Sequence, residues 1–125
     1  MKQTAAALVA QAHGRIESVT PHEAADELAA GATVLIDVRE ADELSAHGRI
    51  PGSTWVPRGL LEFRSDPASP RHQAGLEPGR RVILHSERGE RSALAAATLR
   101  DMGYVRVAHL DGGITAWKEA GKPTV

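Results

Sequence analysis

The chain has 125 residues, of which 42% are hydrophobic and 25% are charged, and its formal net charge is -1. This length and composition are typical of one globular domain that buries a core without disulfides or metals, and the charge gives no electrostatic reason to expect nucleic acid or an anionic membrane as a partner. The absence of cysteine excludes disulfides, zinc–thiolate sites and thiol catalysis.

The N-terminal stretch MKQTAAALVAQAHGR predicts an amphipathic helix over about residues 1–14. Its apolar part is short and is interrupted by Gln11 and His13, which argues against a secretory signal. No apolar run approaches the roughly 20 residues that a membrane-spanning helix needs. We therefore expect a cytoplasmic location, no membrane partner, and a single domain over residues 1–125 whose motif-bearing core spans about residues 16–122.

A capped helix and a buried strand open the predicted core. Thr20 and Glu23 have the spacing of a capping box, and Gly31 marks the end of the helix that follows. The next apolar segment, TVLID at residues 33–37, is short and rich in β-branched side chains, as in a buried strand.

The alternation of helix and strand continues to the end of the chain. The pattern predicts, in order, a helical turn at 40–48, a brief strand at 53–57, a helix at 58–65, a Pro/Gly loop at 66–80, a strand at 81–85, a helix at 91–103, a strand at 105–110, a turn at 111–113 and a helix at 114–121. Such alternation predicts an α/β fold: a small parallel sheet of about five strands with helices on both faces. Ligands bind such sheets at the carboxyl ends of the strands, so we expect a site at the loops after Asp37, His85 and Leu110.

The loop SERGE, residues 86–90, has features of an anion-binding site. Gly89 lets the backbone curl, and the N–H groups of Ser92 and Ala93 in the first helical turn are expected to point back toward the loop. Arg91 adds a planar group with a permanent positive charge. The alternative is an ordinary strand–helix connection in which the first serine only caps the turn locally.

Four motifs in register along the chain resemble those of the rhodanese family. SERGERS at residues 86–92 resembles the active-site loop Cys-x-x-Gly-x-Arg-Ser/Thr, with Ser86 at the position of the catalytic cysteine. The other three, LIDVRE at 35–40, HGRIPGS at 47–53 and LDGGITAW at 110–117, resemble the family's Asp-Val-Arg, Gly-His-Ile-Pro-Gly-Ala and Gly-Gly…Ala-Trp elements. The resemblance implies a rhodanese-like domain of the thiosulfate sulfurtransferase type.

In active members of that family the cysteine takes a sulfur from thiosulfate, becomes a persulfide and passes the sulfur to a thiophilic acceptor, with no metal and no other cofactor. The resemblance therefore implies a small sulfur-containing anion such as thiosulfate as partner, and a protein acceptor is compatible with it. It places Ser86 and Arg91 at catalytic positions and Asp37 and Arg39 in support. The anion-binding loop it implies consists of Glu87, Arg88, Gly89, Glu90, Arg91 and Ser92.

Serine at the cysteine position removes the basis of this chemistry. A persulfide needs a sulfur on the protein, and a helix dipole contributes only about 0.3–2 kcal/mol toward ionising a hydroxyl. Serine nucleophiles also need an adjacent base, whereas alternation along the strand turns His85 away from Ser86. Leu84 and Arg88 stand where a nucleophile elbow has glycine. We expect this chain to be inactive in sulfur transfer.

Several explanations of this serine stay open. It replaces a cysteine of an active parent by engineering, or it is natural and the domain is an inactive binding or regulatory module. A serine-dependent hydrolase is a remote third reading. A phosphatase loop is disfavoured because four residues separate Ser86 from Arg91, one fewer than in those loops.

The remaining polar residues are given less specific roles. Glu87 and Glu90 offset the two loop arginines and are expected to be solvated, while Asp37 and Arg39, joined by Glu43, order the neighbouring loops through charge and hydrogen bonds. The six histidines lack a metal-binding spacing, so no metal site is predicted.

Overall fold

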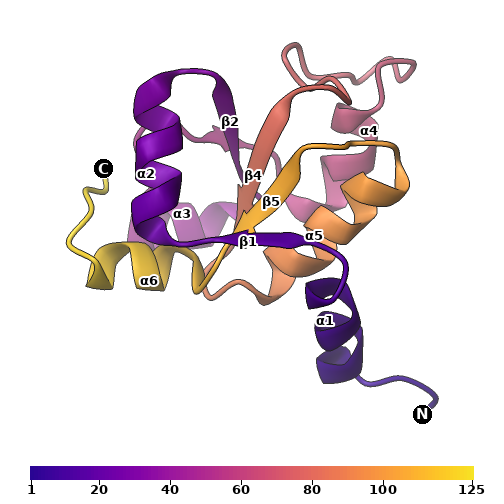
Figure 1. Ribbon diagram of the computed structural model, residues 1–125, viewed down its shortest axis with the longest axis horizontal. Coiled ribbons are helices and arrows are strands. Elements are labelled where there is room, and N and C mark those ends of the chain that lie inside the picture. Colours follow the sequence, from indigo (N-terminus) through magenta and orange to yellow (C-terminus); the bar gives the residue numbers. More distant parts are fainter.

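The computed structural model describes residues 1–125 and contains one five-stranded sheet (Figure 1). Its strands are β1 (Glu17–Val19), β2 (Thr33–Asp37), β3 (Thr54–Trp55), β4 (Arg81–His85) and β5 (Val107–Leu110), arranged in the order β1-β5-β4-β2-β3. Every neighbouring pair is parallel, which confirms the predicted fold class. β1 was not predicted, because three residues are too few to show a strand period; its pairing with β5 defines it.

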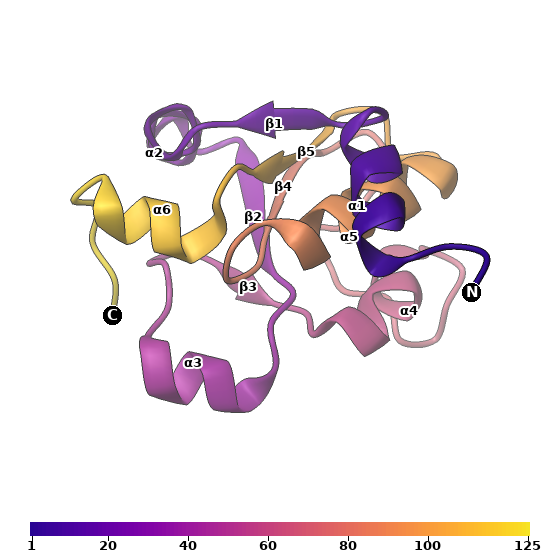
Figure 2. The same ribbon diagram turned by 90° about the horizontal axis from the view of Figure 1, so that it is seen from below.

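The helices are α1 (Ala5–His13), α2 (Pro21–Ala30), α3 (Ala41–His47), the 3-10 turn η1 (Arg58–Leu60), α4 (Leu61–Ser65), α5 (Glu90–Asp101) and α6 (Gly113–Glu119). Figure 2 shows α2 and α6 against one face of the sheet and α1, α4 and α5 on the other. None of these helices has the length and apolar character that a membrane crossing requires.

The two faces of the sheet carry separate hydrophobic clusters, and β4 contributes to both. Val82 and Leu84 pack in the cluster that includes Leu99 of α5, while Ile83 packs in the cluster that includes Trp117 of α6. Successive strand residues point to opposite faces, so a strand covered on both sides is apolar throughout. This explains why the run RVILH has no alternation of apolar and polar residues.

Local sequence signals set two of the helix boundaries. At the start of α2, Thr20 Oγ1 accepts a hydrogen bond from the Glu23 amide (3.1 Å), and the Glu23 carboxylate accepts one from the Thr20 amide (2.9 Å), which confirms the predicted capping box. α5 begins at Glu90, one residue before the predicted start, because Gly89 takes a left-handed conformation (φ 102°) as the N-cap.

The parallel register brings the predicted ligand-binding loops to one edge of the sheet. Asp37 pairs with His85 at the ends of β2 and β4, and Leu84 pairs with His109 next to the end of β5. The loops that follow these strands therefore leave the sheet side by side, as expected for carboxyl ends in an open α/β sheet.

Candidate functional site

The loop between β4 and α5 closes around the side chain of its first residue. Ser86 Oγ accepts hydrogen bonds from the backbone amides of Gly89 (3.3 Å) and Ser92 (3.2 Å), and Ser86 is only 1% exposed. The left-handed Gly89 makes this return possible, since a side chain there would be strained. The hydroxyl thus occupies the centre of the curl that the sequence predicted.

Several backbone donors around this hydroxyl have no acceptor. The amides of Glu87, Arg88, Glu90 and Arg91 donate no hydrogen bond within the chain. The Ala93 amide, which was expected to point to the loop, instead donates to the carbonyl of Gly89 (3.0 Å) inside the first turn of α5. The donors available to an anion are therefore those of the loop and of the first two helical residues.

The carbonyl side of the loop is anchored by the start of α6. The amides of Ile114 and Thr115 donate to the carbonyl oxygens of Ser86 and Glu87, both at 3.0 Å. Gly113 lies so close beneath the loop that a Cβ there would collide with both of these oxygens. Because the two polar groups of a trans peptide unit point in opposite directions, the amides of Glu87 and Arg88, which follow these carbonyls, face away from α6.

A buried ion pair supports one flank of the loop. The Arg39 guanidinium donates to both carboxylate oxygens of Asp37 (3.0 and 2.9 Å) and to the carbonyl of Gly48 (2.8 Å). Its remaining nitrogen lies 3.5 Å from the Glu87 carboxylate, and its own carbonyl accepts a hydrogen bond from the Trp55 indole (2.8 Å). Arg39 thus ties three loops together at the edge of the sheet.

His85 lies under the loop without touching the Ser86 hydroxyl. Its Nδ1 is 3.3 Å from the Ser86 carbonyl oxygen, and its Nε2 is 3.5 Å from the Asp37 carboxylate. Burial lowers the pKa of His85, so the ring is held neutral. No histidine or carboxylate contacts Ser86 Oγ, and the serine-dependent hydrolase reading therefore finds no support.

The other flank of the loop carries a more exposed ion pair. Arg91 donates to the two carboxylate oxygens of Glu43 on α3, at 2.6 and 2.8 Å. These hydrogen bonds lower the pKa of Glu43 to about 2. The sequence analysis predicted that Arg91 binds an anion and that Glu43 only supports the neighbouring loops. Their direct ion pair forms because the fold brings α3 close to the start of α5.

The two other charged side chains of the loop make no ion pair: Arg88 and Glu90 are exposed to solvent. The structure also contains no group of three or more His, Asp or Glu side chains arranged to hold a metal ion.

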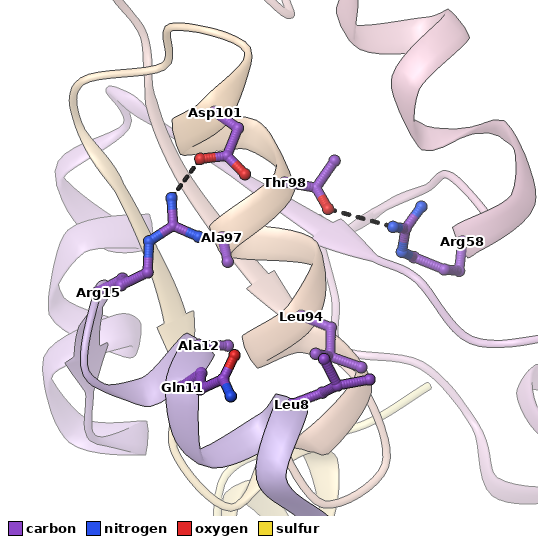
Figure 3. A pocket seen from close by; sticks show the side chains of 9 residues that line it. All are labelled: Leu8, Gln11, Ala12, Arg15, Arg58, Leu94, Ala97, Thr98 and Asp101. Atoms are coloured by element: carbon purple, nitrogen blue, oxygen red, sulfur yellow. Dashed lines mark hydrogen bonds and ion pairs between the residues drawn. The ribbon is translucent and has the colours of Figure 1, made fainter. Parts of the chain in front are cut away.

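A surface pocket of about 310 Å³ lies away from this loop, along α1 and α5 (Figure 3). An ion pair between Arg15 and Asp101 and a hydrogen bond from Arg58 to Thr98 (3.2 Å) flank it. It shares no residue with the 86–92 segment, so the chemistry of the loop does not involve it.

The architecture and the loop agree with a family comparison. The model of the Rhodanese-like domain matches residues 20–120. The chain belongs to the rhodanese-like domain family. The match includes strands β2 to β5, the 86–92 loop and Gly113, so the four motifs that suggested the resemblance all lie inside it.

Relatives of this rhodanese-like domain include sulfurtransferases. A sulfurtransferase of Allochromatium vinosum is 35% identical over 92 residues, which is 74% of this chain and 78% of the relative. A thiosulfate sulfurtransferase structure from Pseudomonas aeruginosa is 27% identical with a TM-score of 0.80, covering 97% of this chain and 22% of the other. A Rhodopseudomonas palustris protein of unknown function, described as a possible tyrosine phosphatase, is 36% identical with a TM-score of 0.93, covering 100% and 96%.

Proposed function

We propose that this rhodanese-like domain binds a small sulfur-containing anion such as thiosulfate at the 86–92 loop but carries no sulfur covalently. The observation that carries the proposal is the position of Ser86 Oγ, which is buried at the centre of the loop and accepts hydrogen bonds from two backbone amides. In the family resemblance this is the position of the cysteine that becomes a persulfide.

The chemistry of serine explains the second half of the proposal. Sulfur transfer requires a thiolate to attack the outer sulfur of thiosulfate, with sulfite leaving as the sulfur–sulfur bond of the donor breaks. The Ser86 hydroxyl has no sulfur to form the new bond, and no base contacts it. The unmodified chain is therefore expected to be silent in sulfur transfer.

The donors around Ser86 support the first half. The amides of Glu87, Arg88, Glu90 and Arg91 have no acceptor within the chain, and the last two begin α5, at the positive end of its dipole. Glu43 already neutralises Arg91, so the affinity for an anion depends on backbone amides more than on side-chain charge. The sulfurtransferase relatives favour a sulfur oxyanion as the ligand class.

A second candidate is a complete sulfurtransferase site that lacks only its thiol, and its support is the intact curl of the loop around position 86. Tyrosine phosphatase activity is not proposed, since the loop is one residue shorter than phosphatase loops and offers no thiol. The single-domain organisation of residues 1–125 and a cytoplasmic location stay predictions.

The test compares the unmodified chain with Ser86→Cys in thiosulfate-to-cyanide sulfur transfer, with thiosulfate binding measured in parallel by calorimetry. Ser45→Cys is the matched control. Ser45 is exposed on α3, so this substitution adds a thiol outside the loop. We expect the unmodified chain to bind thiosulfate. We expect Ser86→Cys to transfer sulfur to cyanide, and the unmodified chain and Ser45→Cys to show no sulfur transfer. Binding by the unmodified chain with a silent Ser86→Cys would favour the inactive binding module.

Two results would overturn the proposal. Sulfur transfer by the unmodified chain would refute the role given to Ser86, and absence of thiosulfate binding by both the unmodified chain and Ser86→Cys would refute the anion site.

A further inference from the structure

A buried network of side-chain hydrogen bonds lies beneath the loop and connects it to the edge strand β1. The Ser92 hydroxyl donates to the Gly89 carbonyl (3.2 Å) and lies 3.1 Å from Nδ1 of His109 on β5. The other ring nitrogen, Nε2, lies 3.0 Å from the Ser18 hydroxyl on β1. Ser92 and His109 are both fully buried. The mechanism of the loop described so far makes no use of this network.

The distances in the network are compatible with two arrangements of its protons. A Ser92 hydroxyl that donates to the Gly89 carbonyl can only accept from the ring of His109, whereas a Ser92 hydroxyl that donates to the ring leaves that carbonyl to the amide of Ala93. In the first arrangement His109 carries its proton on Nδ1, and its bare Nε2 accepts from the Ser18 hydroxyl. Only this arrangement uses the Ser92 hydroxyl to hold the backbone of the loop, at the Gly89 carbonyl.

The surroundings of His109 keep the ring neutral. Burial, with a smaller contribution from the neighbouring His13 of α1, lowers the pKa of His109 to about 4, against a weaker opposing effect of Asp111. The two imidazole rings are 5.0 Å apart in an edge-to-face arrangement. Near neutral pH the ring is thus neutral and carries a single proton.

The network acts on the same atoms that hold the loop closed. Gly89 and Ser92 supply the two amides that donate to Ser86 Oγ, and the Ser92 hydroxyl holds the carbonyl of Gly89. Gly89 also lies next to the ring, since a Cβ added at Gly89 would be 3.5 Å from His109 Cε1. A change at His109 is therefore transmitted to both amides through one hydrogen bond and one packing contact.

We propose that His109 is a positioning residue of the anion-binding loop, acting through its Nδ1–H donor to Ser92 so that the Gly89 and Ser92 amides stay directed at residue 86. The inference rests on the proposed function, since the amides of Gly89 and Ser92 hold the shape of the loop whose other amides are free to bind the anion. His109 contacts no ligand; it fixes the backbone that would contact one.

The test uses side chains that place a donor at different points of the ring. In His109→Asn the amide nitrogen lies near the position of Nδ1, in His109→Gln it lies near Nε2, and His109→Leu has neither. In the Ser86→Cys background we expect His109→Leu and His109→Gln to raise the KM for thiosulfate about tenfold with a smaller change in kcat, and His109→Asn to stay within about twofold.

A second readout does not depend on anion binding. Nitrogen chemical shifts of the imidazole in the unmodified chain should report the Nδ1–H tautomer, and the amide resonances of Gly89 and Ser92 should shift in His109→Leu and His109→Gln but much less in His109→Asn. These spectra also show whether each variant is folded.

The two proposals fail in different ways. If Ser86→Cys and the unmodified chain do not bind thiosulfate, the proposed function fails, and the amide shifts still decide the role of His109. If thiosulfate is bound but His109→Leu leaves the KM and both amide resonances unchanged, or if His109→Gln substitutes as well as His109→Asn, the positioning role is overturned. An Nε2–H tautomer in the unmodified chain would also overturn it.

Discussion

Two arginines flank the candidate loop, and each forms a two-pronged ion pair with one carboxylate, but their environments differ. The Arg39 side chain is 0% exposed, as is that of its partner Asp37, whereas the Arg91 side chain is 41% exposed beside Glu43. Removing one partner of a buried pair leaves an uncompensated charge, while an exposed pair exchanges its partner for water at little cost. The Arg39–Asp37 pair therefore stabilises the fold, whereas the Arg91–Glu43 pair reduces the positive charge beside the loop.

The further contacts of the two arginines support this distinction. Arg39 also donates to the Gly48 carbonyl and lies near the Glu87 carboxylate, so three loops depend on it. Arg91 makes no side-chain hydrogen bond apart from those to Glu43. Three substitutions, taken from the largest expected effect to the smallest, test whether this difference holds.

Arg39→Met should lower the free energy of unfolding by about 3–5 kcal/mol, because the buried Asp37 carboxylate loses its only cationic partner at hydrogen-bond distance. Chemical denaturation followed by circular dichroism measures this. The double variant Asp37→Asn with Arg39→Met is the control and should recover part of the loss, since it leaves no unpaired charge. A loss below about 1 kcal/mol would show that this pair behaves like an exposed one.

Arg39→Lys should have an intermediate effect, lowering the free energy of unfolding by about 1–3 kcal/mol. Lysine keeps the charge beside Asp37 but cannot reach both carboxylate oxygens and the Gly48 carbonyl in one plane, as the guanidinium does. The same denaturation experiment measures it, and the indole proton resonance of Trp55 reports whether the Arg39 carbonyl has moved. Equal stability of the lysine variant would mean that charge alone, without the planar geometry, supports this flank.

Glu43→Gln should change stability least at neutral pH, by about 0–1 kcal/mol, because the pair is partly exposed. It should also tighten thiosulfate binding severalfold by releasing the Arg91 charge toward the loop. If the variant binds thiosulfate no better, Arg91 does not face the anion even when it is free.

The pH dependence of Glu43→Gln sharpens this last comparison. The folded-state pKa of Glu43 is lowered from its usual value of 4.5 to about 2, so its stabilising contribution is present above about pH 4.5 and is lost as the pH falls toward 2. Acid titration of stability should therefore show a shallower slope between these values in Glu43→Gln than in the unmodified chain. Identical slopes would show that the pair contributes nothing to folding.

The sequence predicted much of this arrangement, and the part that it missed has a common cause. The capping box of α2, the continuous apolar run of β4 and the glycine at 89 are local signals, and the structure reproduces each of them. The pairing of Arg91 with Glu43 joins residues 48 positions apart, and no local pattern announces it. β1 was missed for a similar reason, since it is defined by its pairing with the distant β5. The Ala93 amide is a different case, because its acceptor is the local Gly89 carbonyl and the helix simply begins one residue earlier than predicted.

His109 is the clearest example of a residue that sequence reasoning passed over. It was grouped with the scattered histidines because none of the six has a metal-binding spacing. A weak signal was present, since a histidine inside the buried strand VAHL needs hydrogen-bond partners. The partners themselves, Ser92 and Ser18, lie 17 and 91 positions away, so only the folded chain identifies them.

The sequence by itself determined the α/β alternation, the glycine-dependent turn after β4 and the serine at the start of that turn. These depend on backbone preferences and side-chain chemistry at neighbouring positions. The tertiary structure decided which arginine is buried, which carboxylate neutralises the other, and which histidine lies beneath the loop. Burial and hydrogen-bond partners come from segments that meet only when the sheet closes, and they set the charge and the orientation of the donors at the site.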